Sequence, residues 1–305
     1  MTSLLSAKEI KNEKNAAALS SVIAAIGLTT FKIIVGILTG SLGILAEAAH
    51  SGLDLIAALV TFIAVQLSGR PPDEEHPYGH GKIENLSALF ETLLLLATCV
   101  WIVYEAIQRL FFHPVEVELS IWAFIVMATS IVIDLSRSRI LSKAAKKFNS
   151  QALEADALHF STDIYSSAVV IFGLLLVGLS KLFTSFTWLK NADAIAALAV
   201  ALIVIYISFE LGVRTIQGLL DSAPKDMSKQ IKQIVESIDG INDCHHIRVR
   251  HSGPHLFVDV HILMDGNLTL KQAHALTEVV EEKIRTISSD ADVTVHPEPI
   301  TEKPD

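Results

Sequence analysis

The chain has 305 residues, of which 51% are hydrophobic and 19% charged, and its mean hydropathy is +0.47. A soluble globular protein seldom reaches that hydropathy, because its charged surface lowers the average. The formal net charge of −9 disfavours nucleic acid as a partner and is compatible with cation binding. The composition therefore argues against a soluble or nucleic-acid-binding protein and indicates an integral membrane protein.

Long apolar segments fill most of the first 216 residues, and each approaches the length of about 20 residues that crosses a bilayer as a helix. Six membrane spans are predicted, at residues 16–38, 42–67, 83–111, 118–140, 152–180 and 192–216. From Pro224 onward the chain is polar and long enough for a small folded core. We therefore predict a short N-terminal segment (1–15), a six-helix transmembrane domain (16–216) and a small folded C-terminal domain (217–305).

Positive charges in the short connecting segments predict the orientation of the chain. Lysines precede the first span, and a second basic group is assigned to the connection between the fourth and fifth spans: Arg137, Arg139, Lys143, Lys146 and Lys147. Cytoplasmic loops carry such an excess, so both termini and the polar domain are predicted to be cytoplasmic. The first span lacks a small-residue cleavage site and is predicted to be a retained helix.

The second and fifth spans repeat one pattern: an acid, two spacers, a histidine, three spacers and an aspartate. His50 and Asp54 are four residues apart, as are His159 and Asp163, so each pair lies on one helix face. A charged side chain in hydrocarbon costs at least ~2.5–3.5 kcal/mol on insertion scales, which makes a functional role the default. The alternative is that each histidine merely hydrogen-bonds the aspartate of its own helix, and the occurrence of two matching pairs disfavours it.

Together the two pairs suit a divalent transition metal. Two imidazoles and two carboxylates form a tetrahedral nitrogen and oxygen set of the kind that binds zinc. Two ionised aspartates with two neutral histidines would be neutralised by one divalent cation, and protons are expected to replace the absent metal. The pattern thus predicts one site where metal and protons compete. Glu47 and Asp156, one turn before each histidine, are predicted either to orient the imidazole or to line the pore.

The loop between the second and third spans contains prolines, glycines, acids and histidines, which predict a structured turn. Asp73, His76 and His80 are spaced to converge on a cation. A merely solvated, charged loop is the alternative. The predicted orientation makes this loop cytoplasmic.

The polar domain is predicted as helix, strand, strand, helix and strand. The segments are Lys225–Ser237, Cys244–Arg250, His255–Met264, Leu270–Arg285 and Asp292–His296. This order predicts a small open α+β sandwich with helices on one sheet face. Of the two cysteines, Cys99 is predicted to be a buried hydrophobic residue, and Cys244 is a candidate soft ligand.

These motifs together resemble the cation diffusion facilitator family of divalent-metal transporters. The matching elements are Thr39-Gly40-Ser41, the HSxxD from His50, the HPYGHGKxE loop from His76 and the HxxxD from His159. The resemblance implies a homodimeric, proton-coupled exporter with six spans and a metallochaperone-like, ferredoxin-like cytoplasmic domain. It also implies a transport site of His50, Asp54, His159 and Asp163, and a second, weaker loop site of Asp73, His76 and His80.

The resemblance extends to the polar domain, where it implies a cytoplasmic zinc cluster. Its residues in this chain are His245, His261, His274, His296 and Glu298. The glutamate stands where relatives often carry aspartate and reaches one methylene further. The resemblance also implies an ion pair between protomers, formed by Lys82 and Asp221 where the membrane domain meets the cytoplasmic domain. His246, His251 and His255 match no part of the cluster and are predicted to be surface residues.

The leading prediction is a secondary transporter, not an enzyme, that exports a divalent cation, foremost Zn²⁺, in exchange for protons, with Zn²⁺ also binding the cytoplasmic domain as a regulatory ligand. The donor set favours zinc, and export of Fe²⁺, Co²⁺, Cd²⁺ or Mn²⁺ by the same fold is the alternative. A membrane metalloenzyme is disfavoured because no HExxH or comparable motif supplies a general base. A metal-responsive scaffold that transports little stays open. The short loops favour a bacterial inner membrane.

Overall fold

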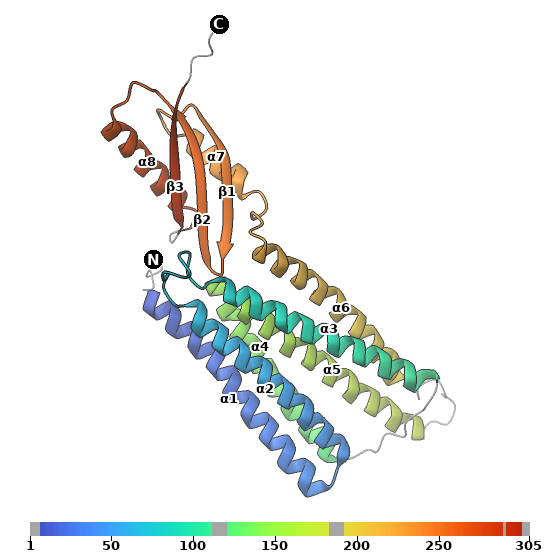
Figure 1. Cartoon of the computed structure of the whole chain (residues 1–305). Coiled ribbons are helices and arrows are strands. Elements are labelled where there is room, and N and C mark those ends of the chain that lie inside the picture. Colours follow the sequence, from blue (N-terminus) through green and yellow to red (C-terminus); the bar gives the residue numbers. More distant parts are fainter. Residues whose placement is uncertain (1–6, 112–120, 183–191, 289–290, 301–305) are drawn as a thin grey trace. The chain divides into compact units, whose positions relative to one another are not determined.

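The computed structural model describes residues 7–111, 121–182, 192–288 and 291–300. The chain divides into two compact units, which Figure 1 colours along the sequence. The first unit comprises residues 1–70 and 83–216, and the second comprises residues 71–82 and 217–305. The loop 71–82 therefore belongs with the C-terminal unit, although in sequence it lies between two helices of the first.

Six long helices make up the first unit, and each predicted span falls on one of them. They are α1 (Ala7–Thr39), α2 (Leu42–Ser68), α3 (Lys82–Phe111), α4 (Ile121–Phe148), α5 (Gln151–Leu182) and α6 (Ala192–Leu219). Among the described residues, five helices are long and apolar enough to cross a membrane, and α5 is the long helix outside that set. Glu154, Asp156 and Asp163 in the first half of α5 lower its hydropathy.

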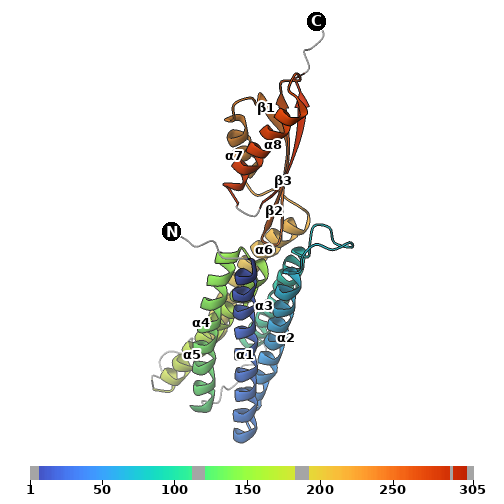
Figure 2. The ribbon, with the colours of Figure 1, turned by 90° about the vertical axis from the view of Figure 1, so that its left-hand side faces the viewer.

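A short turn joins α1 and α2 and sets them side by side. Gly40 has a φ of +64°, a conformation that favours glycine, and Ser41 caps α2 by accepting a hydrogen bond from the backbone N–H of Ile44 at 3.4 Å. Helix α1 packs along α2 and also contacts α4, which packs along α5 (Figure 2). Helices α2 and α5, far apart in sequence, are thereby brought into contact.

The interior of the first unit is rich in small and polar side chains, whereas its outside is apolar. Ala18, Ala57 and Thr61 are fully buried, but Leu38 and Leu42 are each 81% exposed. A soluble domain shows the reverse arrangement. Small residues let membrane helices approach closely, and an apolar outside of this kind suits a surrounding of lipid chains. The buried polar side chains therefore mark the functional part of the helical unit.

The second unit is a three-stranded sheet with two helices. Its elements are α7 (Met227–Glu236), β1 (Asp243–Ser252), β2 (His255–Met264), α8 (Leu270–Arg285) and β3 (Asp292–Pro299). The strand order is β1-β2-β3, with β1 and β2 antiparallel and β2 and β3 parallel. Helix α8 is the crossover between the parallel strands, and Thr269 with Gln272 forms a capping box at its start. The predicted order of elements and the α+β fold are confirmed.

The two faces of this sheet differ in chemistry. Alternate strand residues such as Val258 and Ile262 are buried with Ile231 of α7 and Ile284 of α8, so both helices cover one face. Cys244 belongs to this core and is fully buried, and burial raises the pKa of its thiol to about 11. A neutral thiol inside the core is a poor metal ligand, so the candidate role of Cys244 as a soft ligand receives no support.

Candidate metal centres

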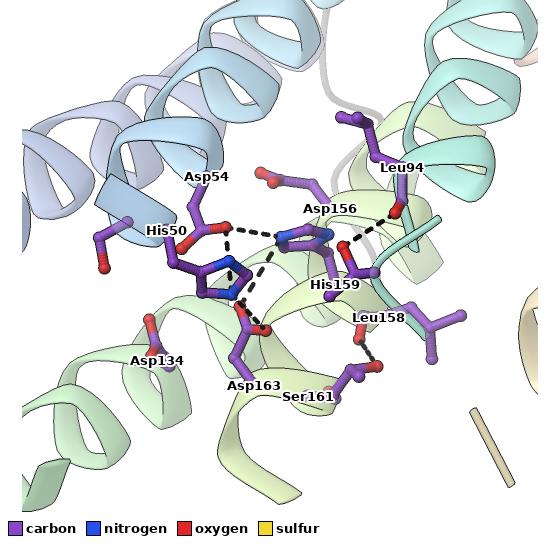
Figure 3. A network of polar contacts seen from close by, with 12 residues as sticks. His50, Asp54, Leu94, Asp134, Asp156, Leu158, His159, Ser161 and Asp163 are labelled. Carbon is purple, nitrogen blue, oxygen red and sulfur yellow. Dashed lines mark hydrogen bonds and ion pairs between the residues drawn. The ribbon is translucent and has the colours of Figure 1, made fainter. Parts of the chain in front are cut away.

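The histidines and aspartates of the two repeats meet between α2 and α5 (Figure 3). His159 Nε2 lies 3.1 Å from Asp54 Oδ1 and 3.7 Å from Asp163 Oδ2. His50 Nε2 lies 3.9 Å from Asp54 Oδ1 and 3.9 Å from Asp163 Oδ1. Each histidine thus faces the aspartate of its own helix and that of the other helix. Ligand atoms of Asp54, His159 and Asp163 all lie within 4.8 Å of one another, close enough to share one cation.

The shortest contact in this set joins two helices. The within-helix distances of 3.9 and 3.7 Å are too long for hydrogen bonds, whereas His159 and Asp54 are 3.1 Å apart. The arrangement therefore disfavours the alternative in which each pair satisfies itself. Asp54 and His159 are only 7% and 4% exposed, and all four side chains line a cavity of about 450 Å³.

The acid that opens each repeat has a partner outside the His/Asp set. Lys32 Nζ lies 3.2 Å from Glu47 Oε2 and donates a 2.8 Å hydrogen bond to Ser51. Asp156 Oδ2 accepts a hydrogen bond from Ser21 at 3.1 Å. In the described part of the chain, neither Glu47 nor Asp156 hydrogen-bonds an imidazole. The predicted role as orienting partners is therefore not seen, and Glu47 lines the cavity instead.

Two charged residues of α4, Asp134 and Arg137, belong to the helical interior, and neither was predicted to lie there. Arg137, predicted to lie in a basic connection, is 4% exposed and lies 3.4 Å from Asp134 Oδ1. It donates a hydrogen bond to Ser21 at 3.0 Å, and its guanidinium lies 3.3 Å from the ring centroid of Phe160. The prediction failed because a basic charge was taken as the mark of a connection, although position 137 lies within the predicted span 118–140 and Arg137 is among the buried residues of α4. The spacing of Asp134 and Arg137, one helical turn apart, was the available signal.

In the second unit, the predicted loop residues converge. Asp73 Oδ1 accepts a 2.7 Å hydrogen bond from the backbone N–H of His76 and lies 3.2 Å from His76 Nδ1. Asp73 Oδ2 lies 3.4 Å from His80 Nε2, and the two imidazole centroids are 4.5 Å apart. The backbone hydrogen bond from His76 lowers the pKa of the Asp73 carboxyl, which keeps it anionic. One carboxylate and two imidazoles make a set that could hold a metal ion, beyond what a merely solvated loop requires.

The same loop packs tightly against the hairpin of β1 and β2. The rings of Tyr78 and Phe257 meet edge to face with centroids 5.5 Å apart, and Arg250 lies 4.3 Å from the Tyr78 centroid. At Gly81 an added Cβ would lie 2.1 Å from the carbonyl oxygen of Ser252, nearer than side chains approach a backbone. Glycine is therefore required at this position for the loop to reach the hairpin.

Gly81→Ala is expected to release the loop from the hairpin, because the methyl group can be accommodated only if the backbone moves. Hydrogen exchange of residues 71–82, followed by mass spectrometry on the full chain, should accelerate by about 10-fold or more, the equivalent of the usual cost of overpacking. Gly27→Ala is the matched control, since no heavy atom lies within 4 Å of the methyl position there. Unchanged exchange in Gly81→Ala would contradict the close packing.

The ion pair between Lys82 and Asp221 forms within one chain. Lys82 Nζ lies 3.0 Å from Asp221 Oδ1 and donates a hydrogen bond to the carbonyl oxygen of Leu219 at 3.2 Å. Arg250 lies 3.6 Å from the same Asp221 oxygen. Within one protomer, this pair fastens the end of the loop to the start of the C-terminal unit, and the pairing between protomers stays a prediction.

On the sheet face opposite α7 and α8, the strand register gathers three histidines. His245 is paired with His261, and His261 with His296, so one histidine from each strand lies in a row. Glu298 Oε1 lies 2.7 Å from His261 Nδ1, and Glu298 Oε2 lies 3.3 Å from His245 Nε2. The hydrogen bond from His261 lowers the pKa of the Glu298 carboxyl, so the row of imidazoles shares an anionic partner.

The structure adds one histidine to this cluster and leaves one out. His246, predicted to be a surface residue, has a φ of +47° beside a bulge in β1, and its ligand nitrogen lies within 4.8 Å of those of His245 and His261. In a regular strand neighbouring side chains point to opposite faces, so alternation alone could not reveal this. His274 was predicted as a member, but it lies on α8 beside Glu278 at 3.6 Å. Because α8 covers the opposite face of the sheet, one chain does not bring His274 to the cluster.

Comparisons with known proteins agree with this architecture. Residues 18–220 match the cation efflux transmembrane domain, and residues 223–300 match the cytoplasmic domain of cation efflux proteins. Cation-efflux pump FieF of Shewanella oneidensis is 31% identical over 286 residues, which are 93% of this chain and 94% of that protein. FieF of Cronobacter sakazakii is 33% identical over 289 residues, 94% and 93% of the two chains.

A solved structure of the metal-bound C-terminal domain of the CzcD transporter from Thermotoga maritima is 30% identical, with a TM-score of 0.24. The match covers 26% of this chain and 93% of the CzcD domain. The family matches cover most of the sequence, and both FieF relatives align over more than nine tenths of it. The chain belongs to the cation diffusion facilitator family, as its motifs predicted, and is an integral membrane transporter of divalent metal cations with a small cytoplasmic α+β domain.

Proposed function

We propose that this protein is a homodimer that exports Zn²⁺ from the cytoplasm in exchange for protons. The observation that carries the proposal is the interhelical set of two histidines and two aspartates, in which His159 and Asp54 lie 3.1 Å apart in a buried position. Two imidazole nitrogens and two carboxylate oxygens form the donor set and tetrahedral geometry that zinc takes in proteins. The same four groups bind protons when the metal is absent, which couples the two ions at one site.

The exchange follows from charge. With Zn²⁺ bound, Asp54 and Asp163 neutralise the cation and the two neutral imidazoles donate lone pairs to it. When the metal leaves, the carboxylates and imidazoles are left facing one another at distances of 3.1 to 3.9 Å, and protons compensate the negative charge. Because the ligands come from two helices, a relative movement of α2 and α5 can open the site to one side of the membrane or the other.

Orientation and location complete the proposal. Lysines at the start of α1 favour a cytoplasmic N-terminus, and the second unit matches a domain described as cytoplasmic. The FieF relatives come from bacteria, which supports the bacterial inner membrane as the location. The metal then leaves the cytoplasm by way of the His/Asp site between α2 and α5. In the cytoplasm, the loop and sheet clusters serve as regulatory metal sites.

The test of transport uses purified full-length protein in liposomes with an imposed pH gradient. Zn²⁺ uptake is followed with an enclosed metal indicator, and proton movement is followed with an enclosed pH dye. We expect Zn²⁺ and protons to move in opposite directions. If Zn²⁺ does not move but Fe²⁺, Co²⁺, Cd²⁺ or Mn²⁺ does, the exported cation is that metal and not zinc. If none of these metals moves, a non-transporting scaffold is favoured.

His261→Ala is expected to remove most of the metal-dependent stabilisation of the cytoplasmic domain, because His261 is shared by both groups of ligands on the sheet. The measurement is the Zn²⁺-dependent rise in the unfolding temperature of the full chain with Asp54→Asn in its transport site and Asp73→Asn in its loop site. His255→Ala, on the same strand and outside both groups, is the control. An equal rise in both variants would remove the sheet cluster from the proposal.

A further inference from the structure

A third helix contributes a buried carboxylate that belongs to neither repeat. Glu91 of α3 is fully buried, and one of its carboxylate oxygens accepts a hydrogen bond from the Thr61 hydroxyl of α2. Its other oxygen, Oε2, has no hydrogen-bond partner in the described part of the chain. Leu95, one turn later on α3, lines the cavity that holds the transport ligands. Glu91 therefore lies one turn from that cavity, on the side where α3 begins.

A second glutamate on the same helix shows what is unusual about Glu91. Glu84, two turns earlier and also fully buried, forms an ion pair with Lys14 of α1 and accepts hydrogen bonds from Ser68 and Ser150. Among the described residues, no lysine or arginine forms an ion pair with Glu91. One helix thus carries two buried carboxylates, of which the first has a cation as partner and the second does not.

The charged groups that face Glu91 do not compensate it. Those with the strongest electrostatic effect on it are Asp156 and His159 on α5 and Arg137 on α4, while α2 faces it with the neutral Thr61. Arg137 is already bound to Asp134 and Ser21. Asp156 adds a further negative charge, and its Oδ1 also has no partner among the described residues. An ionised Glu91 would therefore be an uncompensated charge in a site without water contact, which is costly unless a cation or proton is supplied.

The formal charges of the helical interior do not balance without protons. Two pairs, Lys32 with Glu47 and Lys14 with Glu84, are internally neutral. Five further carboxylates, either buried or part of the His/Asp set, share a single guanidinium, that of Arg137, so four negative charges remain if all five are ionised, and one divalent cation neutralises two of them. The carboxylates are Asp54, Asp163, Asp134, Asp156 and Glu91. Protons must supply the rest even when the metal is bound, and more of them when it is absent.

We infer that Glu91 is a proton-binding site separate from the His/Asp transport site, which holds a proton in the metal-free protein and releases it toward the cytoplasm when Zn²⁺ binds. The inference rests on the proposed exchange of Zn²⁺ for protons. In the step, the O–H bond of the Glu91 carboxylic acid breaks, the proton leaves, and the new carboxylate is stabilised by the cation held at His159. The electrostatic interaction between Glu91 and His159 connects the two sites without a shared ligand.

The test compares the proton-to-metal ratio of the parent with that of Glu91→Gln, which keeps the shape of a neutral acid but has no proton that ionises. With both dyes enclosed in the same liposomes, we expect Zn²⁺ uptake to persist and the ratio to fall by about one proton per Zn²⁺, since each exchanged site contributes its own proton. The matched control is the double variant Lys14→Met with Glu84→Gln, which removes a neutral pair from the same helix face. It is expected to keep the parent ratio.

The outcomes separate this inference from the proposed function. If the parent and Glu91→Gln exchange Zn²⁺ for protons at the same ratio, the role of Glu91 is overturned but the proposed exchange stands. If the parent moves no protons, the role of Glu91 and the proposed exchange are both overturned. Infrared difference spectra on Zn²⁺ addition give a second readout. The parent should lose a protonated carboxyl band that Thr61→Val shifts, and this holds even if Glu91→Gln does not fold. A parent spectrum without such a Zn²⁺-dependent band, or a band that Thr61→Val leaves unshifted, would also overturn the inference.

Discussion

Asp54→Asn and Asp163→Asn are each expected to reduce Zn²⁺ transport by more than about 100-fold, because even the outer partners of metal ligands cost about 10- to 100-fold when they are changed. Each substitution keeps the size of the side chain and removes one of the two charges that neutralise the cation. Asp54 carries the shortest interhelical contact, and Asp163 contacts both histidines, so neither can be replaced by its neighbour. The measurement is the liposome assay with Zn²⁺ and a pH gradient.

The matched control is Glu47→Gln, which removes an acid of the same repeat and the same cavity. Glu47 pairs with Lys32, and its side chain is 49% exposed, so its loss should lower the rate only modestly. Equal transport by the parent and by both aspartate variants would show that the cation takes another route. Loss of transport in Glu47→Gln alone would move the essential acid from the His/Asp set to the mouth of the cavity.

The membrane helices and the convergence of the His/Asp pairs could be predicted because their signals are local. A run of apolar residues defines a span, and a spacing of four places His50 with Asp54, and His159 with Asp163, on one face. The assignment of Arg137 failed for a related reason. A basic residue near the end of a span is typical of a cytoplasmic connection. Only the packing of α4 against α1 and α5 shows that the Arg137 guanidinium contacts Asp134, Ser21 and the Phe160 ring.

The cytoplasmic cluster shows a second limit of sequence reasoning. Strand alternation can predict which face a histidine takes, but the family resemblance is what put His261 and His296 together, and the register pairs them in one row. A bulge and a positive φ at His246 break that alternation, and the residue types in β1 do not predict either feature. Whether His274 can join the cluster depends on which sheet face α8 covers. The burial of Val280 and Ile284 in the core fixes that face.

Arg137→Leu is expected to destabilise the helical unit by about 3–5 kcal/mol, the usual cost of removing one partner from a buried ion pair. The substitution leaves Asp134 without its cation and removes the hydrogen bond to Ser21, which itself donates to Asp156. It also removes the guanidinium from the Phe160 ring. The free energy of unfolding, or the unfolding temperature in detergent, is the measurement.

Arg139→Leu is the matched control, because Arg139 lies on the same helix but is exposed, and its loss should change stability little. Asp134→Asn added to Arg137→Leu should restore part of the lost stability, since the aspartate is then no longer an uncompensated charge. Rescue of stability without rescue of transport would show that Arg137 also sets the electrostatics of the metal site. If Arg137→Leu were as stable as Arg139→Leu, the buried network around Ser21 would not hold the helices together, and its charges would serve transport alone.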